Sequence, residues 1–114
     1  MKFNKNSYRP LPEGLTIKES SIDGLGLFAT KDWDAGELLG ISHVLCKSLY
    51  YDIEEWIRTP LGGFINHSNT PNCFMVYERV NGAKSYWRRR AYTVKPVKAR
   101  EEVTAYYTLL KHKY

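Results

Sequence analysis

The sequence lacks the features that mark a membrane or secreted protein. Its 114 residues contain no apolar run near the ~20 residues that a transmembrane helix needs. The N-terminal stretch MKFNKNSYRPLPEG also has no apolar segment of the kind found in signal peptides. We therefore expect a soluble, intracellular protein without membrane contacts, located in the cytoplasm or the interior of a host cell, with the nucleus also open.

Cysteine and histidine are scarce. Cys46 and Cys73 are too few for a disulfide framework or a four-thiolate zinc site. One disulfide between them is the alternative to the expected pair of free, buried thiols. The histidines, His43, His67 and His112, show no metal-binding spacing such as two histidines four residues apart on a helix. We expect no structural metal.

Common nucleotide and hydrolase motifs are missing as well. No phosphate-binding loop and no G-x-S-x-G elbow occur, and Cys73 with His67 six residues before it is not by itself a nucleophile–base pair. The segment GLGLFA at 24–29 has only two of the three glycines of a dinucleotide fingerprint. Alone, it predicts no more than a turn between strands.

The net charge of +5 is modest, and the run Arg88, Arg89 and Arg90 supplies part of it. A basic balance raises the expectation of a polyanionic partner. In a strand, however, Arg88 and Arg90 would share one face while Arg89 takes the other. This pattern favours a solvated sheet face over a binding patch, so nucleic acid is not expected as the primary partner.

The chain is a single domain of short β-type segments separated by turn signals. We place an N-terminal extension at 1–14, the domain at 15–110 and a short basic tail at 111–114. Asn81-Gly82 is a strong hairpin signal between two β-rich runs. The β-type or apolar segments are 15–19, 27–29, 37–45, 73–80, 85–94 and 101–110.

One segment, 52–58, resembles a helix. Ile53, Trp56 and Ile57 recur at the spacing of one helical face, and the proline at position 60 would end the element. The pattern predicts a short helix of about two turns.

Three segments in order carry a family resemblance. GLGLFA at 24–29, GGFINHSNTPNC at 62–73 and EEVTAYY at 101–107 resemble the landmarks of SET-domain protein lysine methyltransferases. Gly63 stands where that family often has arginine, and Val103 where it often has leucine. The resemblance runs from about Leu15 to Tyr107, and the length is similar to that of compact SET proteins encoded by some viruses and bacteria.

The resemblance implies a mostly β, β-clip-like SET fold of several small sheets with one or two short helices. It also implies a knot-like C-terminal crossing, a rare exception to the rule against threaded chains. The Asn-His-Ser motif and the closing 101–107 strand would meet there. The implied activity is transfer of methyl groups from S-adenosyl-L-methionine to a lysine ε-amine, without a metal.

Site residues follow from the same resemblance. Tyr107 corresponds to the catalytic tyrosine, which also lies beside the cofactor. Glu101 and Glu102 are expected to anchor the strand and the crossing rather than to do chemistry. The other cofactor-binding positions are Asp23, Gly24, Leu25, Asn66 and His67.

The substrate channel departs from the family pattern at Ala105, where many members carry a large aromatic residue. The channel is therefore expected to be roomier unless another side chain fills it, with Met75 and Tyr92 as candidates. Further candidate channel residues are Tyr50, Tyr51, Leu109 and Tyr114. A second subunit completing the site, and so a homodimer, stays open.

The partner implied is a protein that presents a lysine, such as a histone or another basic host protein. The alternative is a catalytically inactive SET-like module that binds a peptide or nucleic acid. The intact motifs around Asn66 and Tyr107 argue against that alternative.

Overall fold

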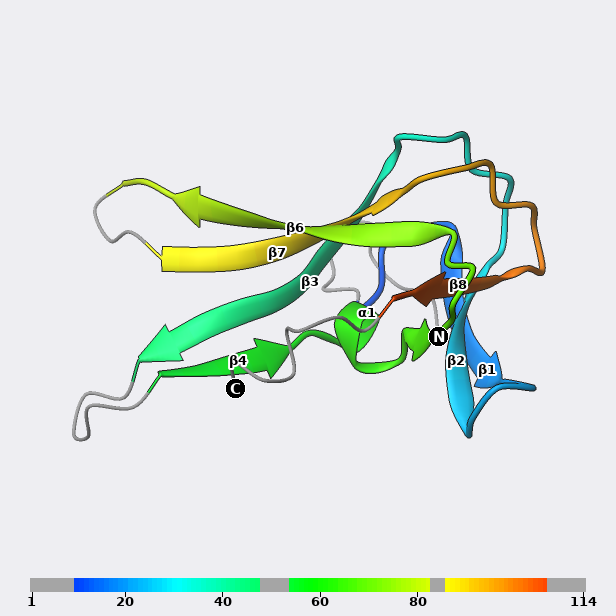
Figure 1. Cartoon of the computed structure of the whole chain (residues 1–114), viewed down its shortest axis with the longest axis horizontal. Coiled ribbons are helices and arrows are strands. Elements are labelled where there is room, and N and C mark those ends of the chain that lie inside the picture. The colour runs from blue at the N-terminus through cyan, green and yellow to red at the C-terminus, as the bar shows by residue number, and fades with distance from the viewer. Residues whose placement is uncertain (1–9, 48–53, 83–85, 107–114) are drawn as a thin grey trace, which may run out of the picture.

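The computed structural model describes residues 10–47, 54–82 and 86–106, and the regular elements in these residues are β-strands with one short helix (Figure 1). The expected mostly β class is therefore confirmed. In chain order the elements are β1 (Leu15–Glu19), β2 (Leu25–Ala29), β3 (Leu38–Lys47), β4 (Glu54–Arg58), α1 (Pro60–Gly63), β5 (Asn66–His67), β6 (Cys73–Val80), β7 (Tyr86–Thr93) and β8 (Glu102–Ala105). In the described part of the chain, no helix is long and apolar enough to span a bilayer.

The strands hydrogen-bond along one path in the order β1-β2-β8-β6-β7-β3-β4, and β5 pairs with β8 beside that path. The small sheets expected from the resemblance are thus joined edge to edge. Strand β8 is the last described strand, yet it lies between the β1–β2 pair and the β6–β7 hairpin (Figure 1). It runs antiparallel to β2 and parallel to β5 and β6.

Most expected strands occur where the sequence placed them. The β6–β7 hairpin pairs from Cys73 with Thr93 to Val80 with Tyr86, which confirms the turn expected around Asn81-Gly82. The closing strand is shorter than the expected 101–110, because β8 ends at Ala105 and residues 107–110 lie outside the described residues.

The hydrophobic core surrounds β8 and the strands beside it. Leu27 of β2 pairs with Val103 of β8, and both side chains are fully buried. Burying a branched aliphatic side chain of this size stabilises a fold by roughly 1.5–3 kcal/mol. The other buried members of this cluster are Leu15, Ala29, Trp33, Leu39, Leu61, Ile65, Cys73, Ala91, Val97 and Ala105.

Helix α1 is held against β3 by its first residues. Thr59 is its N-cap and accepts a hydrogen bond from the Gly62 N–H at 3.2 Å. The Thr59 hydroxyl also donates to the Ile41 carbonyl at 2.6 Å, and the Thr59 N–H donates to Ser42 O at 3.0 Å. Gly62 approaches β3 so closely that a Cβ there would overlap the Ser42 carbonyl.

The helix predicted at 52–58 is wrong: the described part of this segment is strand β4, and the helix begins later, at Pro60. Pairing with β3 sends Trp56 to one face of the sheet and leaves Ile57 52% exposed on the other. Short apolar runs fit both helical and strand periods, and here pairing with a ten-residue neighbour decides between them. Asp52 and Ile53 lie outside the described residues.

The two cysteines differ, so the expectation that both are buried is only half correct. Cys73 is 2% exposed in the core. Cys46 is exposed and lies near the end of β3, where it pairs with Glu55 of β4. Burial raises the pKa of the Cys73 thiol to about 12, so Cys73 is a neutral core side chain rather than a nucleophile.

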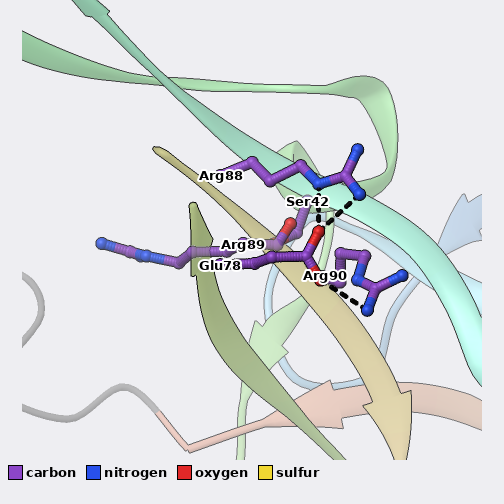
Figure 2. Close-up of polar contacts among 5 residues, drawn as sticks. All are labelled: Ser42, Glu78, Arg88, Arg89 and Arg90. Atoms are coloured by element: carbon purple, nitrogen blue, oxygen red, sulfur yellow. Dashed lines mark hydrogen bonds and ion pairs between the residues drawn. The ribbon is translucent and has the colours of Figure 1, made fainter. Parts of the chain in front are cut away.

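The arginine run alternates across β7 as expected. Arg88 and Arg90 both form ion pairs with Glu78 of β6, and Figure 2 shows Arg89 leaving the strand on the opposite side. Arg88 Nε donates to Glu78 Oε1 at 2.6 Å, and this hydrogen bond raises the pKa of Arg88.

The expected solvated face is wrong for Arg89, which is 2% exposed. Its guanidinium lies 4.2 Å from the ring centroid of Trp56 and 4.8 Å from that of Tyr77. Both distances fall within the range of cation–π attraction, which strengthens when the cation is desolvated. The aromatic rings thereby replace much of the water that a surface arginine would have.

Gly62→Ala tests the close packing of α1 on β3. The added methyl group overlaps the Ser42 carbonyl, so the helix must shift, and we expect a loss of about 1–3 kcal/mol in the free energy of unfolding. Gly63→Ala is the matched control, because a Cβ there meets only Arg58 Cβ at 4.0 Å. Urea unfolding measures both, and equal stabilities for the two variants would contradict the packing argument.

A second prediction concerns His43. Burial, followed by the charges of Arg89 and Arg58, lowers the pKa of His43 from 6.5 to about 4. Between these two pH values the unfolded chain binds a proton at His43 that the folded chain does not. The contribution of neutral His43 to the free energy of unfolding is therefore complete above pH 6.5 and is lost as the pH falls toward about 4. Allowing for solvent screening of a partly exposed ring, we expect a loss of about 1–2 kcal/mol.

Urea unfolding of the native protein and of His43→Gln, above pH 6.5 and near pH 4, isolates this share. Carboxyl groups titrate in both proteins, whereas the glutamine stays neutral. The native protein should therefore lose more stability than the variant, and equal losses would show that His43 is not responsible.

Candidate active site

The Asn-His-Ser motif meets the closing strand directly. In β5, Asn66 pairs in parallel with Thr104 and His67 with Ala105 of β8. The Ser68 N–H then donates to the Ala105 carbonyl at 2.9 Å. The meeting of these two segments, expected from the resemblance, is confirmed.

Asn72 fastens the end of the polar loop to the same strand. Its Nδ2 donates to the Glu102 carbonyl at 2.8 Å, and its Oδ1 accepts from the Thr104 N–H at 2.9 Å. The side chain is 7% exposed, so these contacts satisfy backbone groups away from water. The sequence pattern did not single out Asn72.

Asn66 reaches from β5 to the loop before β2. Its Nδ2 lies 3.1 Å from the Asp23 carbonyl, 3.2 Å from the Leu25 carbonyl and 2.9 Å from Glu102 Oε2. One amide nitrogen thus connects two predicted cofactor-binding positions to the closing strand. The amide oxygen of Asn66 makes none of these contacts and is suited to accept a hydrogen bond from a ligand.

Glu102 completes a group that we call the Glu102 clasp, made of Ser20, Asn66 and Glu102. The Ser20 hydroxyl lies 2.7 Å from Oε1 and 2.9 Å from Oε2 of the carboxylate. Ser20 Oγ also accepts from the Ile22 N–H at 2.9 Å, so the clasp orders the turn that carries Asp23. These contacts are those of an anchoring residue, the role expected for Glu102.

The two glycines of GLGLFA serve different purposes. Gly24 has a φ of +44°, a left-handed conformation that favours glycine, and its carbonyl accepts from the Ser20 N–H at 2.8 Å. Gly26 instead leaves room for a side chain, because a Cβ there would overlap Glu102 Oε2. The second glycine therefore makes the Glu102 clasp sterically feasible.

His67 and Tyr106 form an aromatic pair beside the clasp. Their ring centroids are 4.9 Å apart, and His67 Nε2 lies 3.1 Å from Asn69 Oδ1. Tyr106 is 51% exposed and directly precedes Tyr107 in the sequence. Tyr107 itself lies outside the described residues.

The structure separates two of the candidate channel residues. Ala105 pairs with Cys73, and Met75 projects from the same face of β6, where it packs against the core cluster that contains Ala105. Tyr92 pairs with Phe74 on the opposite face and stacks on its ring at 5.7 Å. Met75 therefore lies on the same face of β6 as Cys73, the partner of Ala105, whereas Tyr92 lies on the opposite face. Three further candidates, Tyr50, Tyr51 and Leu109, lie outside the described residues, as does Tyr114.

The chemistry of the assembled site suits a ligand with a positively charged group. The Glu102 carboxylate, the backbone carbonyls of Asp23 and Leu25, and the Asn66 amide oxygen are all hydrogen-bond acceptors. Among the residues that the structure describes, no three histidine, cysteine or acidic side chains gather as a metal site would require.

Sequence reasoning missed Ser20, and it named Gly26 only as part of a turn. Ser20 and Glu102 are separated by 82 positions, and a lone serine before a turn carries no signal of such a contact. Only the pairing of β2 with β8 brings them together.

Residues 24–108 match the sequence profile of the SET domain. No curated protein matches the chain in sequence. The fold is similar to that of a Plasmodium falciparum crystal structure described as a candidate histone methyltransferase, with a TM-score of 0.70 and 17% identity. That match covers 86% of this chain and 96% of the other chain.

Two chains of Polycomb Repressive Complex 2 are also similar, each with a TM-score of 0.63 and 22% identity. One is an apo complex with mutations in Ezh2, and the other is a humanized mutant of the Chaetomium thermophilum complex bound to an inhibitor. The matches cover 83% of this chain but only 15% of each of those chains. Identities this low demonstrate a shared fold alone.

Ser20→Ala tests the Glu102 clasp. It removes a hydrogen bond to a carboxylate and the acceptor for the Ile22 N–H, so we expect a loss of about 1–2 kcal/mol in the free energy of unfolding. Ser21→Ala, at the exposed neighbouring serine, should change stability by less than about 0.5 kcal/mol. Urea unfolding compares the two, and similar values would mean that the clasp contributes little to folding.

Proposed function

Because the chain belongs to the SET-domain family, we propose that it is a protein lysine methyltransferase that uses S-adenosyl-L-methionine. The observation that carries this proposal is the parallel pairing of Asn66 and His67 with Thr104 and Ala105, two positions before Tyr107. That pairing joins the second and third motifs of the resemblance, and the pairing of β2 with β8 adds the first.

The described residues fit such a cofactor. The acceptors around Asn66 suit the α-ammonium and sulfonium charges, and Glu102 supplies a full negative charge among them. The predicted contact at Gly24 is sterically open, because a Cβ there would meet no heavy atom within 4 Å. The exposed ring of Tyr106, paired with His67, offers an aromatic surface for the adenine.

Bound S-adenosyl-L-methionine supplies an activated methyl group for in-line displacement by the lysine amine. In such a transfer the substrate amine, and not a side chain of this protein, would be the nucleophile. The lysine must be neutral first, although its ordinary pKa is about 10.4. Desolvation against Ala105 and Met75, and a nearby positive charge, both favour proton loss.

Tyr107 is proposed as the catalytic residue, with its hydroxyl beside the transferring methyl group. Its neighbours support this role, since Ala105 and the Ser68 backbone fix the strand that leads to it. The protein contributes mainly alignment of the amine with the methyl group, an effect that can lower a barrier by several kcal/mol. The small Ala105 leaves room for a methylated lysine, and Met75 limits that room from the same face.

Tyr107→Phe tests this assignment. We expect transfer of labelled methyl groups to protein to fall by about 10²-fold or more, while cofactor binding measured by calorimetry changes little. Tyr86→Phe is the control, since Tyr86 lies at the far end of the β6–β7 hairpin and should retain full activity. Mass spectrometry locates the methyl-lysine.

The possible outcomes separate the alternatives. Cofactor binding without transfer to any histone or lysate protein would favour a non-catalytic binding module. Transfer that Tyr107→Phe leaves unchanged would instead reject the residue assignment and retain the enzyme.

A further inference from the structure

The turn between β1 and β2, residues 20–24, has no buried side chain to hold its shape. Ser20 is partly buried, and residues 21–25 are all exposed. The strand that follows changes at once, because residues 26–29 are buried. A segment without buried apolar contacts belongs to the least stable part of a fold. The shape of the 20–24 turn therefore depends on its hydrogen bonds.

These hydrogen bonds converge on Ser20. Its N–H donates to the Gly24 carbonyl at 2.8 Å, and its Oγ accepts from the Ile22 N–H at 2.9 Å. The hydroxyl has one hydrogen, which it donates to the Glu102 carboxylate, 2.7 Å from Oε1 and 2.9 Å from Oε2. Glu102 thus fixes the direction of the Ser20 hydroxyl, and with it the lone pair that holds Ile22.

Glu102 also fixes the amide of Asn66. Asn66 Nδ2 carries two hydrogens and lies 2.9–3.2 Å from three acceptors, namely Glu102 Oε2 and the carbonyls of Asp23 and Leu25. A reversed amide would place Oδ1 against these three oxygens, which would repel it. The nitrogen is therefore held toward the Glu102 clasp, and Oδ1 is left to accept from a ligand.

The clasp is closely packed. A Cβ at Gly26 would overlap the Glu102 carboxylate and would lie 3.0 Å from Ser20 Cβ. The pairing of Phe28 with Glu102 brings the closing strand to this point, and Figure 1 shows β8 beside β2. One carboxylate on β8 therefore supports both the 20–24 turn and the amide on β5.

We propose that Glu102 and Ser20 are positioning residues that set the affinity of the candidate site for S-adenosyl-L-methionine. They act through the 20–24 turn and the Asn66 amide, and not by contact with the cofactor. This inference rests on the proposed function and deepens it, because it gives Glu102 a role beyond anchoring its strand and assigns one to Ser20. If the turn is ordered in only a fraction of the molecules, the apparent dissociation constant rises by the inverse of that fraction.

The negative charge of Glu102, which suits a positive ligand, offers a competing explanation for any effect on affinity. A carboxylate attracts a positive charge at a distance even when its oxygens are already hydrogen-bonded. The clasp favours positioning, since Ser20 and Asn66 already occupy both carboxylate oxygens. The two explanations predict opposite orders of affinity for variants that keep the charge and a variant that removes it.

Calorimetric titration of the full chain with S-adenosyl-L-methionine separates the two explanations. Ser20→Ala removes the hydroxyl and Gly26→Ala displaces the carboxylate, while both keep the Glu102 charge. We expect each to raise the dissociation constant about tenfold. Glu102→Gln keeps an oxygen for Asn66 and a polar atom for Ser20, so its dissociation constant should stay within about threefold of the native value.

Two matched controls lie next to the clasp. Ser21 is an exposed serine, and the Glu101 carboxylate accepts from the Lys98 N–H instead of taking part in the clasp. Ser21→Ala and Glu101→Gln should therefore bind the cofactor like the native chain. In methyl-transfer assays, Ser20→Ala should raise the KM for the cofactor about tenfold and leave kcat within about twofold, because the lost interaction supports binding and not the transfer step.

Amide hydrogen exchange provides a readout that does not depend on the cofactor. The amide of residue 20 bonds to the Gly24 carbonyl through the backbone, so its exchange reports opening of the turn in every variant. It should exchange about tenfold faster in Ser20→Ala and Gly26→Ala than in the native chain and the controls. The Ser68 amide, bonded to the Ala105 carbonyl, should keep its native rate, which shows that the rest of the site is intact.

The inference is overturned if the native chain binds the cofactor and the Ser20→Ala and Gly26→Ala variants bind it as tightly. It is also overturned if Glu102→Gln weakens binding more than they do, which would assign the effect to charge. Either result leaves the proposed function standing. A native chain that binds no S-adenosyl-L-methionine would instead reject the proposed function, and exchange at residue 20 would still decide whether the clasp orders the turn.

Discussion

The pairing of β8 with β2, β5 and β6 is the constraint on which the rest of the structure depends. Each partner comes from a different part of the chain. Without β8, no strand would connect the β1–β2 pair to the four-stranded β6-β7-β3-β4 sheet. The same strand carries Glu102 and Ala105 and leads to Tyr107. The central element of the fold is therefore also the central element of the candidate site.

Side chains complete what these backbone pairings begin. The Asn72 side chain hydrogen-bonds to backbone groups of β8 on both sides of Val103. The Glu102 carbonyl and the Thr104 N–H therefore have partners in a loop that forms no strand pairing there. Glu102 links Ser20 and Asn66, and Gly26 leaves the space that its carboxylate occupies. A carboxylate that is partly removed from water stabilises a fold only when its hydrogen bonds are made, so these residues form a mutually dependent group.

The charge distribution divides one sheet into two chemically different faces. Glu78 pairs with two arginines on one side, while Arg89 on the other is enclosed by aromatic rings. A net charge of +5 gives no hint of this division, because the total does not say which face each charge takes.

The sequence by itself determined the strands with clear alternation, the hairpin at Asn81-Gly82, and the three motifs that identify the family, because each is a local pattern. Tertiary structure alone decided that 54–58 is a strand, that Arg89 is buried, and that Met75 but not Tyr92 lies on the side of Ala105. It also decided the contact of Ser20 with Glu102. The physical reason is the same in each case: strand pairing sets which face a side chain takes and which distant residue it meets, and a local pattern contains neither.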